Sequence, residues 1–169
     1  MIFAGIDPGL DGAIAVISPR KIEIIDIPTL LVGKRREVDA HALVKILRGL
    51  RGGQGGASWS FPSKDLIVGL ERVHSMPKQG VASSFSFGKT AGVLQGVCSG
   101  LQLPFQMVTP QAWHKTMLAG MPKGKDSSIQ KCHELFPEVD CITKKSHHNR
   151  ADALLIAEHI RRTTGGSGE

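Results

Sequence analysis

The sequence contains no tyrosine, and phenylalanine and tryptophan together supply only 5% of its residues. So few aromatic rings leave little material for a surface on which the bases of a single strand could stack. The three cysteines form no C-x-x-C pair, which argues against a zinc site and predicts reduced thiols. No apolar run approaches the ~20 residues that span a bilayer, and the apolar N-terminus is interrupted by Asp7. We therefore expect a soluble, intracellular protein without membrane contacts.

What the sequence does have is the composition of one globular domain with a basic surface. Its 169 residues, 41% of them hydrophobic, are enough for one sizeable core and too few for two ordinary domains. Lysine and arginine number 21 against 15 aspartates and glutamates, and the sequence pI is about 9.5. This balance suits a polyanionic partner such as nucleic acid, although many basic proteins bind none.

The first half of the chain is predicted to contain strands and one helix. Apolar or alternating runs separated by turn residues predict three consecutive antiparallel strands. They are expected at 1–7, 13–17 and 21–27. Apolar residues at helical spacing predict a helix over 39–50, with Asp39 as its N-cap. The glycine- and serine-rich segment 49–60 predicts a loop, and the apolar run 66–70 predicts a strand leading into Glu71.

The second half is predicted to be mostly helical, with one more strand. The expected elements are a helix over 83–101, a strand over 104–108, and helices over 109–117, 126–135 and 149–162. Thr109 can cap a helix, and Pro110 suits its first position. Hairpins combined with crossover helices predict an α/β fold with a mixed five-stranded sheet, its first three strands antiparallel, flanked by helices. We predict one domain over 1–162 and a disordered tail over 163–169.

Three acidic residues occupy positions where charge is unusual. Asp7 and Glu71 end apolar strands, and Asp152 lies in the first turn of the last helix among apolar neighbours. If they meet at one sheet edge, their repulsion requires a bound cation or raised pKa values. Mg²⁺ and Mn²⁺ accept such oxygen ligands, and two ions about 3.5–4 Å apart can stabilise both the attacking water and the leaving oxygen of a phosphodiester.

Each acid also has a purely structural interpretation. Asp7 can be an ordinary turn residue before Pro8. Glu71 can form an ion pair with Arg72 or Lys89. Asp152 can stabilise the partial positive charge at a helix N-terminus.

Four segments follow one another along the chain: GIDPGLDGAIAVI, GLERVHSMPKQGVASSFSFGKTAGVLQGV, VTPQAWHKTM and HHNRADALLIAEHI. Together they resemble the RuvC-like Holliday junction resolvases, with the greatest similarity to the phage and chloroplast branch. The resemblance covers most of the chain between Met1 and Arg162. It implies a ribonuclease H-like fold and a homodimeric crossover junction endodeoxyribonuclease. Such an enzyme hydrolyses paired strands of a four-way junction or related branched DNA during recombination and repair, leaving 5′-phosphate and 3′-hydroxyl ends.

The resemblance also implies a set of metal ligands and a cellular compartment. Two Mg²⁺ or Mn²⁺ ions would be held by Asp7, Glu71 and Asp152 and by a fourth ligand a few residues before the last acid. That stretch has no carboxylate, so His148 is the first choice and His147 the second. Asn149 occupies the position three residues before the last acid and leaves the choice open. The expected compartment is the cytoplasm, that of the host bacterium if the protein is encoded by a phage, with an organelle as the alternative.

Several further residues are expected to contact DNA. Lys125, or alternatively Lys123, would lie near the scissile phosphate and offset its developing charge. Relatives often carry a stacking aromatic residue after the strand-final glutamate, where this chain has His74 and Met76 instead. The remaining candidates are Lys78, Lys89, Lys145, His147 and Arg150. Each of them can equally be a solvated surface residue.

Three other functions are weighed against this one. A ribonuclease H-like nuclease or transposase acting on another nucleic acid is the nearest alternative, because that fold hosts several reactions. An actin-like nucleotide-binding domain also opens with a strand ending in G-x-D-x-G, but this chain is short and lacks a second glycine-rich phosphate loop. A junction-binding module without catalysis would not need the three acids.

Overall fold

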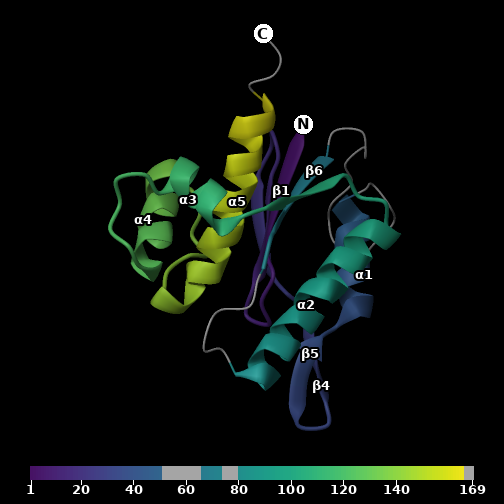
Figure 1. Ribbon diagram of the computed structural model, residues 1–169. Coiled ribbons are helices and arrows are strands. Elements are labelled where there is room, and N and C mark those ends of the chain that lie inside the picture. The colour runs from purple at the N-terminus through teal and green to yellow at the C-terminus, as the bar shows by residue number, and fades with distance from the viewer. Residues whose placement is uncertain (51–65, 74–79, 166–169) are drawn as a thin grey trace.

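A mixed five-stranded sheet forms the centre of the computed structural model, which describes residues 1–50, 66–73 and 80–165 (Figure 1). Its strand order is β3-β2-β1-β6-β7. The strands are β1 (Ile2–Asp7), β2 (Ala13–Ile17), β3 (Ile22–Asp26), β6 (Leu66–Glu71) and β7 (Phe105–Val108). The first three pair antiparallel, whereas β6 runs parallel to both β1 and β7. The predicted sheet is confirmed.

Helices cover both faces of this sheet, as predicted. One face carries α1 (Ala40–Leu50) and α2 (Val81–Gly100), and the other carries α3 (Pro110–Met117), α4 (Lys125–Leu135), a short 3₁₀ turn η2 (Lys145–His147) and α5 (His148–Gly165) (Figure 1). Two apolar clusters lie between these layers, one on each face. None of the helices in the described part of the chain is both long and apolar enough to cross a membrane.

Two glycines bring α5 unusually close to the middle of the sheet. Gly5 of β1 and Gly69 of β6 are register partners on the face that α5 covers. A Cβ atom on Gly5 would lie 2.1 Å from the carbonyl oxygen of Ala153, which is backbone and cannot move aside. A Cβ atom on Gly69 would lie 2.6 Å from the side chain of Ile160. The absence of side chains at this pair therefore fixes how deeply α5 lies on β1 and β6.

Some of the helices begin at the residues that the sequence predicted. Asp39 caps α1, since its carboxylate accepts from the backbone N–H of Ala42 at 2.9 Å, and Thr109 caps α3 as expected. The other starts differ by one or two residues: α2 begins at Val81, and α4 begins at Lys125 after Gly124. At the C-terminus α5 continues through Gly165, so residues 163–165 of the expected tail are helical. Residues 166–169 lie outside the described residues.

A second, two-stranded sheet was not predicted. It is a hairpin of β4 (Thr29–Val32) and β5 (Arg35–Val38), inserted between β3 and α1. Gly33 sits at its turn with a φ of +62°, a conformation that favours glycine. The available sequence signal was the glycine that follows the short apolar run of β4. It was weak because the hairpin has basic residues at half of its β5 positions.

Candidate metal and active site

The first two acids end neighbouring parallel strands. Ile6 of β1 pairs with Leu70 of β6, so the next residues, Asp7 and Glu71, come side by side at the carboxyl ends of the two strands. Successive side chains on a strand point to opposite faces. Asp7 therefore shares the face of Gly5, against which α5 packs. Glu71 lies on that same face.

The third acid reaches the same place from α5. Asp152 directly precedes Ala153, whose carbonyl lies against β1 at Gly5. Burial raises the pKa of Asp7 well above its ordinary value of 3.8, and the negative charges of Glu71 and Asp152 raise it further. The structure thus brings together three carboxyl groups that lie far apart in the sequence.

Glu71 is oriented by a tryptophan. The indole Nε1–H of Trp113, on α3, donates to the carboxylate Oε1 of Glu71 at 2.8 Å. Trp113 is buried in the core beneath α5, so its ring is fixed. Lys89, one of the two partners considered for Glu71, pairs with Glu37 at 2.6 Å. Trp113 was part of a motif in the sequence, but only the fold reveals its contact with the acid.

The turn after Asp7 is tied to the start of α5. The amide N–H of Gly9 donates to the carbonyl of Asp7 at 3.1 Å. A Cβ atom on Gly12 would lie 2.1 Å from that same carbonyl, so the tight turn requires glycine there. The side-chain amide of Asn149 donates to the carbonyl of Asp11 at 2.7 Å. Asn149 therefore holds the β1–β2 turn against the helix that carries Asp152.

Hydrogen bonds distinguish the two histidines considered as a fourth ligand. Nδ1 of His147 accepts from the backbone N–H of Thr143 at 3.2 Å, so a neutral ring carries its proton on Nε2 and has no lone pair there. Nδ1 of His148 lies 3.1 Å from the carbonyl of Lys145, to which it donates. A neutral His148 therefore keeps the Nε2 lone pair that a metal needs.

Both histidines and Asn149 line a shallow cavity of about 510 Å³ next to the β1–β2 turn. Its lining includes Asp11, Arg36, His147, His148 and Asn149. Within the described ranges, no three His, Cys, Asp or Glu side chains form a ready-made metal site. The chemistry of the three acids nevertheless suits a hard divalent cation, because carboxylates are the ligands that such ions prefer and positive charge would relieve the repulsion at Asp7.

The residues expected to contact DNA have varied surroundings. Arg150 donates to both carboxylate oxygens of Asp26, at 2.7 and 2.6 Å, and to the carbonyl of Cys141. These bonds lower the pKa of Asp26 and engage Arg150 in the fold. Lys145 pairs with Asp126 at 3.2 Å and is highly exposed.

Two further lysines lie at the start of α4. Lys123 lies exposed in the loop before α4, and Lys125 is the first residue of that helix. His74, Met76 and Lys78 lie outside the described residues.

Comparison with known proteins identifies the fold. No family model and no curated protein matches the sequence. Among solved structures, the chain is similar to RuvC from Thermus thermophilus, with a TM-score of 0.60, 13% identity and 97% of each chain covered. It is also similar to T. thermophilus RuvC in complex with a Holliday junction substrate, with a TM-score of 0.59, 15% identity and 96% of each chain covered. The chain therefore has a RuvC-like fold.

Proposed function

We propose that this chain is a divalent-metal-dependent endonuclease that resolves four-way DNA junctions and related branched DNA. The observation that carries the proposal is the convergence of Asp7, Glu71 and Asp152, where burial and the two neighbouring charges raise the pKa of Asp7. Carboxylates held close together repel one another and destabilise a fold. A fold that keeps such a cluster is therefore expected to bind a cation there. The similarity to a RuvC solved with a junction substrate supports the choice of DNA.

The proposed cofactor is Mg²⁺ or Mn²⁺, with two ions in each active site. Asp7, Glu71 and Asp152 would hold them, with His148 as the fourth ligand through Nε2. Bound ions of this kind activate water and stabilise the charge on the leaving oxygen, which gives 5′-phosphate and 3′-hydroxyl ends.

The chain's own side chains would prepare the site for those ions. Trp113 holds one carboxylate oxygen of Glu71 by its indole N–H. Asn149 fixes the turn behind Asp7 relative to α5. We propose that Lys125, or Lys123 in the same loop, offsets charge on the reacting phosphate.

Three further features belong to the proposal. The active form is a homodimer, because two opposed strands of a junction need two sites. Residues 1–162 form a single nuclease domain of the phage and chloroplast branch. It acts in the cytoplasm, in recombination and repair.

The test is cleavage of a labelled synthetic four-way junction by purified protein. We expect paired cuts with Mg²⁺ or Mn²⁺ and none in EDTA. Asp7→Asn is expected to lose cleavage, while the matched control Asp140→Asn, at an exposed acid far along the chain, keeps it. Equal cutting in EDTA, or full activity of Asp7→Asn, would contradict the mechanism. Equal cutting of linear duplex or an RNA–DNA hybrid would instead favour another ribonuclease H-like nuclease.

A further inference from the structure

The β4–β5 hairpin is a separate basic ribbon beside the acidic site. It does not belong to the five-stranded sheet and projects from it next to α2 (Figure 1). Lys34, Arg35 and Arg36 follow one another at and after its turn, all exposed, against a single acid, Glu37. Two strands alone are marginally stable in water. The hairpin must therefore be held by contacts with the rest of the fold.

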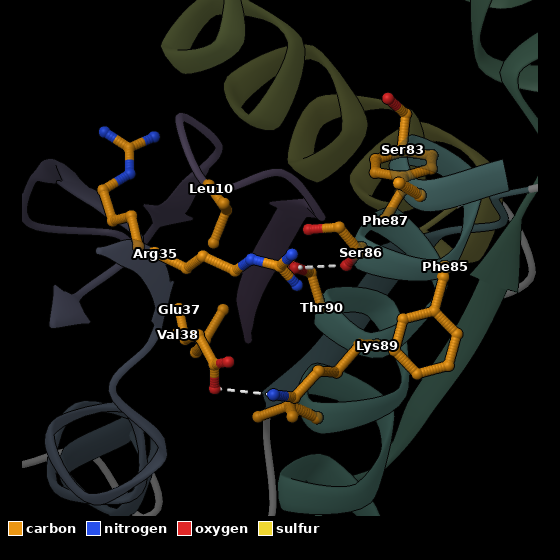
Figure 2. A pocket seen from close by; sticks show the side chains of 13 residues that line it. Leu10, Arg35, Glu37, Val38, Ser83, Phe85, Ser86, Phe87, Lys89 and Thr90 are labelled. Atoms are coloured by element: carbon orange, nitrogen blue, oxygen red, sulfur yellow. Dashed lines mark hydrogen bonds and ion pairs between the residues drawn. The ribbon is translucent and has the colours of Figure 1, made fainter. Parts of the chain in front are cut away.

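Ion pairs from the two faces of the hairpin supply those contacts. Arg36 pairs with Asp11 in the turn that follows the catalytic strand β1. Glu37, on the opposite face of β5, pairs with Lys89 of α2 (Figure 2). Since Asp11 also accepts from Asn149, the hairpin, the turn after Asp7 and the start of α5 are joined in one chain of contacts. The ribbon is therefore fixed relative to the three acids.

A groove separates the hairpin from the first half of α2. Its volume is about 790 Å³. Its lining combines cations, hydroxyl groups and an exposed ring: Arg35, Arg36, Lys89, Ser83, Ser86 and Phe85 (Figure 2). Arg35 shares the face of Glu37, which points to α2, so its guanidinium belongs to this groove. Glu37 is the one acid among the lining residues, and Lys89 already neutralises it.

We propose that the β4–β5 hairpin is a DNA-binding arm, in which Lys34 and Arg35 contact the backbone phosphates of a duplex arm beside the acidic site. The inference rests on the function proposed above and names an element that binds that substrate. Charge complementarity argues for this occupant, because an exposed run of cations fits a polyanion, whereas a second copy of the chain would bring the same positive charge to the contact. Arg36 and Glu37 anchor the arm, which leaves the turn to reach the DNA.

The experiment measures DNA binding in EDTA, where cleavage does not interfere. Fluorescence anisotropy with the full chain gives affinities for a labelled four-way junction and for a linear duplex across roughly 50–200 mM salt. The variant is Lys34→Ala/Arg35→Ala. The matched control is Arg20→Ala/Lys21→Ala, two adjacent cations at the β2–β3 turn, which lies at the opposite end of the sheet from Asp7.

We expect the hairpin variant to bind roughly 10- to 100-fold more weakly at low salt, with a log–log salt slope shallower by about 1.8, because two phosphate contacts are lost. The loss should be similar for junction and duplex, since both carry the same backbone. The control should keep the wild-type affinity and slope. Charge-conserving Lys34→Arg/Arg35→Lys should also bind like the wild type, which distinguishes lost contacts from a damaged fold.

Three results would overturn the proposal that the hairpin is a DNA-binding arm. One is a wild-type affinity and slope in the hairpin variant, and another is an equal loss in the control, which would reflect net charge alone. The third is a lower mass of the hairpin variant by light scattering, which would assign this face to a second copy. If the wild-type protein cuts junctions and the hairpin variant binds DNA normally, the role proposed for the hairpin is wrong but the proposed function stands. If the wild type neither binds nor cuts branched DNA, the proposed function fails as well.

Discussion

Asp7→Asn should stabilise the metal-free protein even though it removes the carboxylate at the centre of the proposed site. The side chain is held among protein atoms next to Glu71 and Asp152, which together raise its pKa. The asparagine side chain is nearly the same size as the aspartate that it replaces. It carries no charge, and its amide can donate to either neighbouring carboxylate. The substitution therefore removes burial of a charge and two repulsions without changing the packing.

The size of the effect follows from the spacing of the strands. Neighbouring strands lie about 4.8 Å apart, so Asp7 and Glu71 start from backbone positions at that separation. Two like charges about 5 Å apart repel by roughly 3 kcal/mol at an effective dielectric constant of about 20. Burial and the charge of Asp152 add to this cost, whereas uptake of a proton by Asp7 limits the total. We expect a gain of roughly 1–3 kcal/mol, or about 2–10 °C in Tm for a chain of this size.

The stability gained by Asp7→Asn should increase with pH. The pKa of Asp7 is higher in the folded state than its ordinary value of 3.8, so the folded protein holds a proton that the unfolded chain releases. This contribution to wild-type stability is complete below that ordinary value and is lost as the pH rises through the folded-state pKa. The advantage of Asp7→Asn should therefore be small near about pH 4 and should grow as the pH rises.

Thermal unfolding followed by circular dichroism measures this directly. Wild type, Asp7→Asn and the control Asp140→Asn are compared in EDTA at several pH values, then with Mg²⁺ or Mn²⁺. Metal at about 100 times its Kd should stabilise the wild type by about 2.7 kcal/mol and Asp7→Asn by much less. An Asp7→Asn protein no more stable than the wild type in EDTA at alkaline pH would refute the electrostatic reasoning. So would a gain that is independent of pH.

Substitutions at three other positions test how the site is built. Gly5→Ala should destabilise the protein by about 3 kcal/mol or more in urea unfolding, because its new methyl group meets the backbone of α5, and a near-neutral result would contradict the close packing. Trp113→Phe should cost about 1–3 kcal/mol and slow cleavage, because Glu71 loses the hydrogen bond from the indole N–H; normal cleavage by a folded variant would show that this bond does not orient the acid. Asn149→Asp should slow cleavage more than Asn149→Ala, because a carboxylate cannot donate to the carbonyl of Asp11 and repels it. Equal rates for the two would argue against this role.

Local sequence patterns anticipated most of the fold. Strand and helix positions were predictable because apolar residues recur with the period of each element, and Asp39 and Thr109 mark helix starts by their capping chemistry. The hairpin escaped prediction because its strands are short and half of β5 is basic, so burial imposes no clear alternation on it. It is stabilised by ion pairs with Asp11 and Lys89, which are distant in the sequence and leave no local signal.

The sequence by itself determined the candidate carboxylates, because Asp7 and Glu71 end apolar strands and Asp152 lies among apolar neighbours in the last helix. It could not decide that Trp113 donates to Glu71, or that His148 rather than His147 keeps a lone pair on Nε2. Those outcomes depend on which groups lie within about 3 Å of each other, and hydrogen bonds and charge repulsion act over that distance in space. Only the tertiary structure sets it, through the parallel pairing of β1 with β6 and the seating of α5 on two glycines.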